Sequence, residues 1–252
     1  MENVNGSKAS GHRLAMFLLG ATLALGFALG AYMLSGALVR MKQESAIHVK
    51  GLSEAKIHSN LATWSCNYWF RSEQVQAGYE GLEKSRTAIM EFLKAQKITP
   101  QEMSINSIDI TTLYKTDEKG NKTNTIEGYV LSQSISVWSS DIMKIDSLAK
   151  QVSELIKTGM ELRSASPTFL YTELESLKLD LLGKATRNAY ERAQVLASNS
   201  GGKVGKLNSA SQGVFQITPV YSTDTSDSGC YDTGSIDKAV RCVVTLEFQV
   251  EK

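Results

Sequence analysis

The amino-acid sequence predicts an α+β protein, in which an N-terminal transmembrane helix precedes a body of helices packed on a mostly antiparallel sheet. Residues 14–39 carry no charge and are almost all apolar. Over residues 46–252, strand-like alternation and helix-like apolar stripes follow one another in the order ββ-α-ββ-α-β-α-ββ. Strands and helices mixed in this order favour an α+β body.

The apolar run 14–39 is long enough to cross a bilayer, since a span needs about 20 apolar residues. It exceeds the core of a cleavable signal peptide, which has about 7–15 residues. It is also apolar on every face, unlike the helix of a soluble domain, which has one apolar stripe. We therefore expect an uncleaved anchor. Small residues at 35–37 leave a cleaved signal peptide as the alternative.

Within this run, Thr22, Gly26 and Gly30 form one row of small residues at a spacing of four. Small residues let two membrane helices approach closely, so the row predicts helix packing in the membrane. Glycine is also frequent in membrane helices for other reasons, and a single GxxxG is a weak signal.

The charges beside the span do not decide its orientation. Lys8 and Arg13 precede it, and Arg40 and Lys42 follow it, so the positive-inside count is nearly tied. Because the N-terminal segment is short, we expect residues 1–13 in the cytoplasm, residues 40–45 as a linker and the body on the far side.

The composition describes an ordinary globular body. The chain has 252 residues, a net charge of +1, three prolines and 8% aromatic residues. A nearly neutral chain has no general attraction to nucleic acid, so we expect no nucleic-acid partner. The 207 residues from 46 to 252 are enough to bury a sizeable core.

The first half of the body is expected to contain two strands, a helix and a hairpin. The strands are 46–58 and 61–71, and the helix begins at Ser72, which can cap it, and stops at Thr99-Pro100. A hairpin follows, with strands 105–114 and 126–138 around the polar turn 117–122, and a bulge near Ser107-Ile108.

The second half is expected to contain two helices and three strands. Asp141 caps a helix that ends near Gly159, and a helix over 174–200 carries alanines at every fourth position. Strands are expected at 162–171, where Pro167 suggests a sheet edge, at 203–217 and at 240–250. We expect the body to be one αβ unit, with a core that includes Trp64, Tyr68, Leu82, Ile89, Ile145, Leu148, Ala189, Ala193, Leu246 and Phe248.

We nominate no catalytic, cofactor-binding or metal-binding residue. His48 and His58 lie ten residues apart on one extended segment, about 33 Å if it is continuous, so they cannot share a metal. Asp224, Asp227 and Asp232 lie in a polar loop whose spacing does not match an EF-hand, and a solvated loop is the favoured interpretation. The sequence contains no CxxC, P-loop or nucleophile-elbow motif.

The three cysteines leave the disulfide pattern open. Cys230 and Cys242 are the candidate pair, because a bridge between a loop and a strand is within reach. Cys66–Cys242 is the alternative. Cys242 also falls on an apolar face with Val240 and Val244, where a reduced core cysteine is common.

Several short phrases of the body follow one another in a specific order: Ile47-x-Val49-x-Gly51, Leu61-Ala62-Thr63, Ile98–Met103, Gly128-Tyr129, Gly202–Leu207 and Val243–Phe248. Each phrase alone is weak, but in combination they resemble the SIMPL (DUF541) family over residues 46–252. In one departure, Ser59-Asn60 stands where the family usually has Pro-Asp before the second strand.

The resemblance implies a bacterial envelope protein without established catalytic residues. Relatives include a periplasmic protein that assembles into a channel-like ring and a protein linked to oxidative-stress defence. We therefore expect a non-enzymatic, single-pass protein of the bacterial inner membrane, with its body in the periplasm. It is expected to form a homo-oligomer or to bind a protein partner that the sequence does not identify, and to need no cofactor. A periplasmic small-molecule-binding module is the alternative.

Overall fold

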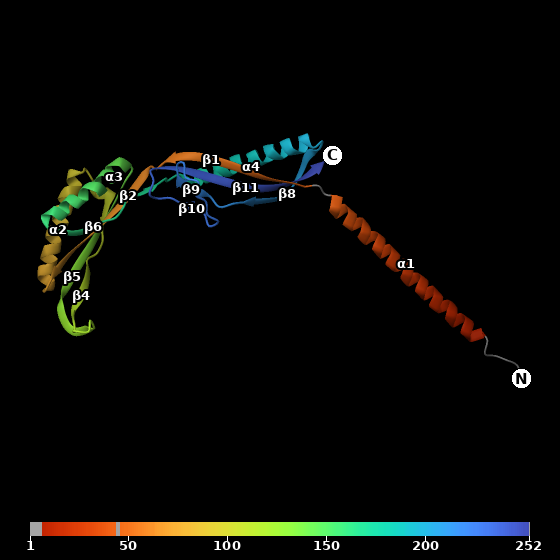
Figure 1. Ribbon diagram of the computed structural model, residues 1–252, viewed down its shortest axis with the longest axis horizontal. Helices are drawn as coiled ribbons and strands as arrows, with labels where there is room; N and C mark the ends of the chain where they lie inside the picture. The colour runs from red at the N-terminus through yellow and green to blue at the C-terminus, as the bar shows by residue number, and fades with distance from the viewer. Residues whose placement is uncertain (1–6, 44–45, 252) are drawn as a thin grey trace. The chain divides into compact units, whose positions relative to one another are not determined.

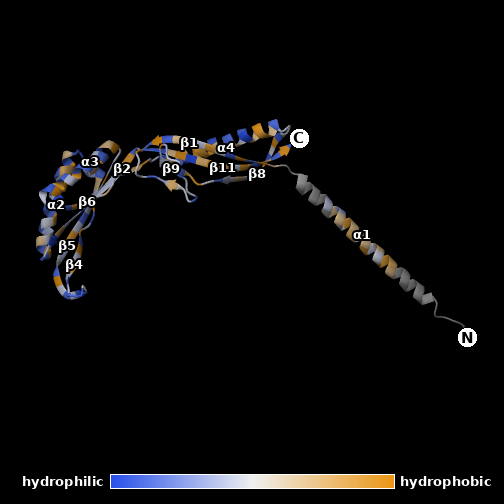
Figure 2. Ribbon diagram, in the orientation of Figure 1, coloured by the Kyte–Doolittle hydropathy of each residue, from blue (hydrophilic) through white to orange (hydrophobic). Residues whose placement is uncertain are grey.

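The computed structural model describes residues 7–43 and 46–251. Its first element is the helix α1, Ser7–Gln43. The segment Met16–Met33 is fully exposed, and among the described residues α1 is the one helix long and apolar enough to cross a membrane. Apolar residues dominate the coloured part of α1 in Figure 2. A signal sequence near the N-terminus would share these properties, so the helix fits either an anchor or a signal.

The remainder is a mixed α+β body, as the sequence predicts, and it divides into two compact units. The first compact unit contains the described residues up to Gly51, the segment Ala189–Ser211 and the end of the chain from Thr245. The second contains Leu52–Asn188 and Gln212–Val244. The sequence leads us to expect one αβ unit, whereas the structure divides into these two compact units, which share several long elements.

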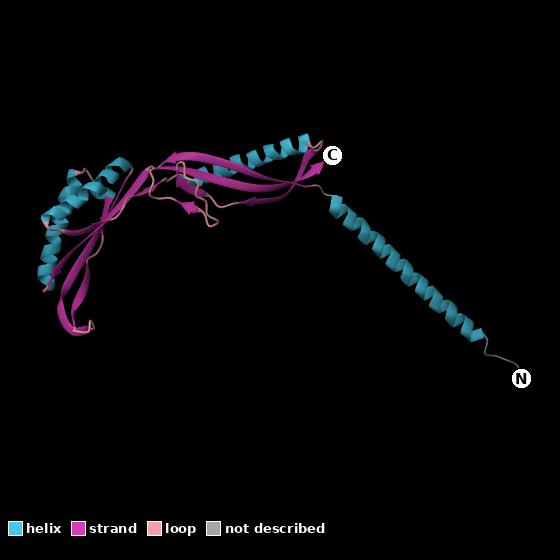
Figure 3. Ribbon diagram, in the orientation of Figure 1, coloured by secondary structure: helices cyan, strands magenta, loops and turns pink. Residues whose placement is uncertain are grey.

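The second unit contains a six-stranded antiparallel sheet (Figure 3). Its central strands are β2, Leu61–Ser72, and β5, Lys122–Ser139, which pair from Ala62↔Ser139 to Ser72↔Tyr129. On its other edge β2 pairs with the short strands β6 (Glu161–Ser164) and β7 (Thr168–Leu170). On its other edge β5 pairs with the short strand β3 (Met103–Ile105) and the longer strand β4 (Asp109–Thr116).

Helices cover this sheet with apolar side chains. They are α2 (Val75–Ala95), α3 (Ile142–Gln151) and the 3-10 helix η2 (Val152–Thr158), while the short 3-10 turn η1 (Pro100–Glu102) leads into β3. Leu82 and Ile89 of α2 and Ile145 of α3 are buried in a cluster with Trp64 and Tyr68 of β2. Burying such side chains is the main favourable contribution to folding.

The second sheet has the order β1-β11-β9-β10, with β8 also paired to β11 (Figure 1). Its strands are β1 (Ala46–His58), β8 (Lys203–Gln212), β9 (Gln216–Pro219), β10 (Cys230–Tyr231) and β11 (Asp237–Glu251). The helix α4, Leu174–Asn199, buries its alanine ladder, with Ala185, Ala189 and Ala193 fully inaccessible. Small side chains at this spacing allow close packing along the whole helix.

Most element predictions are confirmed, and the differences have local causes. All ten predicted core residues are buried. Asp141 caps α3 by accepting the N–H of Lys144. Ser72 does not cap α2, because it ends β2, and Gln74 holds the cap position without a side-chain bond. The predicted strand 203–217 is two strands, since Gly213 lies in the break between β8 and β9.

Candidate functional site

The small-residue row of α1 lines a shallow groove. Thr22, Gly26 and Gly30 form it together with Leu23, Phe27 and Ala31. A side-chain carbon added at Gly26 or Gly30 would meet nothing within 4 Å, so the groove floor is open. The Thr22 hydroxyl donates to the Leu19 carbonyl at 2.9 Å, which satisfies it without a partner from another helix. The geometry is that of a surface on which a second helix can pack.

The structure does not contain the predicted Cys230–Cys242 bridge. Cys66, Cys230 and Cys242 are free thiols. Gln216 of β9 is the register partner both of Cys230 in β10 and of Arg241 in β11, so β9 lies between the two strands. Two strand spacings are about 9.6 Å, beyond the about 4.4–6.8 Å between the Cα atoms of a disulfide. The alternative Cys66–Cys242 bridge is also not formed.

The two histidines of β1 are exposed, as expected from sequence. The Nδ1 atom of His58 lies 2.7 Å from Oδ1 of Asp237, and that of His48 lies 3.9 Å from Glu247. Among the described residues, no group of three or more His, Cys, Asp or Glu side chains is arranged to hold a metal ion.

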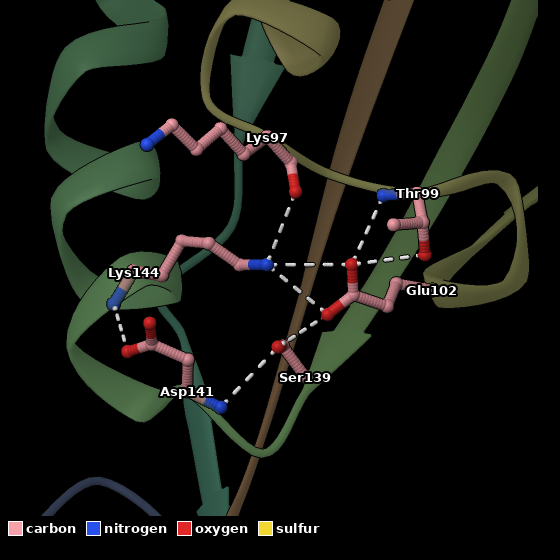
Figure 4. A network of polar contacts seen from close by, with 6 residues as sticks. All are labelled: Lys97, Thr99, Glu102, Ser139, Asp141 and Lys144. Carbon is pink, nitrogen blue, oxygen red and sulfur yellow. Dashed lines mark hydrogen bonds and ion pairs between the residues drawn. The ribbon is translucent and has the colours of Figure 1, made fainter.

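The densest polar network surrounds Glu102 and joins three elements (Figure 4). Its carboxylate accepts from the Ser139 hydroxyl at 2.5 Å and from the Thr99 N–H at 2.9 Å. Lys144 Nζ contacts both carboxylate oxygens, at 3.1 and 3.3 Å, and also donates to the Lys97 carbonyl. Glu102 therefore connects η1, the end of β5 and the start of α3.

These contacts hold Glu102 in its ionised form. The hydrogen bond from Ser139, followed by the backbone N–H of Thr99, lowers the pKa of Glu102 from 4.5 to about 2. A carboxylate this acidic and fully occupied by donors is a poor general base near neutral pH. The network is a structural clamp. The capping pattern Thr99-x-x-Glu102 is a sequence signal for part of it, but nothing local in the sequence indicates Ser139 or Lys144 as partners.

A cavity of about 530 Å³ in the second unit is the other candidate site. The end of β2, one face of α2 and the segment Thr158–Glu161 line it. Glu161 accepts from Trp69 Nε1 at 2.5 Å and lies 3.4 Å from Arg71 Nε. The volume suits a small molecule, and Lys84 adds an exposed cation to the lining. Sequence reasoning missed this cavity because its three segments are far apart along the chain.

The chain combines a mixed α+β body with one exposed apolar helix ahead of it. This architecture fits the class of membrane-anchored α+β proteins. The model of the family SIMPL, described as "Protein of unknown function (DUF541)", matches residues 47–247. The chain belongs to the SIMPL family, as its sequence phrases indicate. The comparison with curated proteins gave no match. SIMPL is not a known enzyme family.

Proposed function

We propose that this protein is a non-enzymatic, single-pass protein of the bacterial inner membrane whose periplasmic body self-assembles or binds partner proteins. Residues 14–39 span the membrane, with residues 1–13 in the cytoplasm and residues 40–45 as a linker. The observation that carries the proposal is the full exposure of Met16–Met33 ahead of a family domain that fills the rest of the chain. Exposed apolar surface of this extent requires lipid or another protein to cover it.

Self-association uses the groove of Thr22, Gly26 and Gly30. Anchoring supports it further, since confinement to a membrane raises the effective concentration of the protomers. A role in envelope or oxidative-stress defence is the biological setting that the family resemblance supplies.

The test is the mass of the full-length protein in detergent, measured by light scattering. We expect an oligomer, and the Gly26→Leu/Gly30→Leu variant should dissociate at a higher protein concentration because two large side chains fill the groove. Gly20→Leu is the matched control, since Gly20 is an equally open glycine on a different face of α1. A monomeric wild-type protein would end the assembly proposal. N-terminal sequencing from membranes tests the anchor, which a mature chain starting between residues 36 and 46 would exclude.

The cavity beside Trp69 favours a second candidate function, the binding of a small periplasmic molecule. Aromatic and charged groups together line it, as in sites that orient an amphipathic ligand. Native mass spectrometry of the membrane-extracted protein should then show a co-purifying molecule. Ala77→Trp adds bulk at an exposed lining position and should abolish that molecule, whereas Ala95→Trp at the end of α2 should not. An identical spectrum for all three proteins would exclude this function.

A further inference from the structure

The sheet of the second unit has one long free edge, the strand β4. Among the described strands β4 pairs only with β5, and six of its eight residues are exposed. The opposite edge is formed by β6 and β7, of only four and three residues. A long free edge presents a row of unpaired N–H and C=O groups, to which another strand can pair. Figure 1 shows β4 and β5 together as a hairpin.

Exposed apolar side chains gather on one face of this hairpin. Ile110, Tyr114 and Ile126, here called the hairpin patch, are 50%, 42% and 49% exposed. Tyr114 lies opposite Ile126 in the β4–β5 register. The β4–β5 register shifts between Leu113 and Tyr114, but the extra residue lies on β5. β4 therefore keeps its own alternation, and Ile110 and Tyr114, four residues apart, point to the same face. An exposed apolar patch beside a free edge is typical of a surface that contacts another protein.

Two copies of β4 have side chains that match each other when the strands run antiparallel. If two copies pair antiparallel about Thr112, Asp109 lies opposite Lys115 of the second copy, and Ile110 lies opposite Tyr114. Opposite charges and an aromatic with a β-branched residue are both favourable cross-strand pairs. Neither Asp109 nor Lys115 forms an ion pair with another described residue. An axis at residue 111 or 113 would lose the charge pairing.

We propose that β4 pairs antiparallel with β4 of a second copy of this chain, about a two-fold axis at Thr112. This inference rests on the proposed self-assembly and assigns it a contact in the body. The pairing is isologous, so each contact occurs twice. It continues the sheet from one copy into the other and places the two hairpin patches side by side on one face, because the paired residues have the same parity.

Cysteine cross-linking of the full-length protein in membranes tests the register. Directly opposite residues in antiparallel strands have Cα atoms about 4.5–5.5 Å apart, within reach of a disulfide. Thr112→Cys should therefore form a covalent dimer under mild oxidation. Thr116→Cys is the matched control, since four residues from the axis its two copies would lie about 27 Å apart. Both carry Cys230→Ser, which removes the half-buried native thiol.

Charge exchange tests the pairing independently of cross-linking. Asp109→Lys or Lys115→Asp places like charges opposite each other twice per dimer, which should raise the dissociation constant about 5-fold. The double variant Asp109→Lys/Lys115→Asp should restore the wild-type value, because the opposite charges are exchanged and not removed. These measurements are made with Gly26→Leu/Gly30→Leu in the background, so that packing of α1 does not hide the contact.

The outcomes separate this contact from self-assembly in general. Selective cross-linking at residue 112 together with rescue by the double variant supports the pairing. Equal cross-linking at 112 and 116, or a wild-type oligomer that becomes monomeric when the α1 groove is filled, overturns the β4 contact and leaves assembly through α1 standing. Charge variants without effect on an oligomer that persists with the groove filled also overturn the β4 contact. A monomer for every protein, the wild type included, overturns both.

Discussion

Replacing Glu102 with Gln should lower the free energy of unfolding at neutral pH and have little effect near pH 2. The carboxylate of Glu102 receives hydrogen bonds from Ser139 and Thr99 and an ion pair from Lys144 at 3.1 Å. Glutamine has a similar shape and keeps some of these hydrogen bonds, but it removes the charge. The substitution therefore isolates the electrostatic part of the clamp.

The magnitude follows from the pKa of Glu102, which the folded state lowers from 4.5 to about 2. At about 1.4 kcal/mol per unit this is about 3 kcal/mol. The side chain is 23% exposed, so screening by water reduces the effect to about 1–2 kcal/mol. Because the folded-state pKa is the lower one, the stabilisation is complete above about pH 4.5 and is lost as the pH falls toward 2.

The assay is denaturant unfolding of the full-length protein in detergent, followed by tryptophan fluorescence from pH 2 to 7. All three tryptophans, Trp64, Trp69 and Trp138, lie in the same unit as Glu102. Glu154→Gln is the control, since Glu154 forms only an exposed pair with Lys157 and should cost at most about 0.5 kcal/mol. A difference between wild type and Glu102→Gln that does not change with pH would refute the electrostatic explanation.

Two further predictions concern packing and thiols. Gly78→Ala should destabilise by about 1–2 kcal/mol, because its added carbon would lie 2.4 Å from buried Leu131, whereas Gly183→Ala in open space should stabilise by about 0.5–1 kcal/mol. Denaturation midpoints would show the opposite signs. In the native protein only Cys230 should react quickly with a thiol reagent, because burial raises the pKa of both other cysteines. After unfolding without reductant three thiols should react, and one thiol would reveal a disulfide.

The sequence predicts the elements and the core well because both depend on local periodicity. In β2, alternation by two places Trp64 and Tyr68 on the buried face. The same regularity makes interruptions visible. Where a bulge is expected near Ser107-Ile108, the structure has a break between β3 and β4, and the register shifts of the hairpin lie further on, between Leu113 and Thr116. Pro167 likewise separates two edge strands, since proline cannot donate a ladder hydrogen bond.

Local sequence patterns do not indicate which distant segments of the chain pair with each other. Cys230 and Cys242 are near in sequence, yet β9 is inserted between their strands. Ser139 and Lys144 complete the Glu102 clamp from about forty residues away, at positions where no local pattern requires them. Period and capping are properties of one segment, whereas such partners are determined by the sheet order, which depends on the whole chain.

The two self-association surfaces lead to different assemblies, and their combination is informative. The β4 contact is isologous and by itself closes at two copies, because each copy uses its β4 edge in the pairing. The groove of Thr22, Gly26 and Gly30 adds a second contact. If the helices pair within the β4 dimer, the assembly remains a dimer and gains affinity by avidity. If they pair between dimers, the two contacts alternate and produce a ring or an open chain. The wild-type mass distinguishes these cases, and filling the groove should leave a dimer in both.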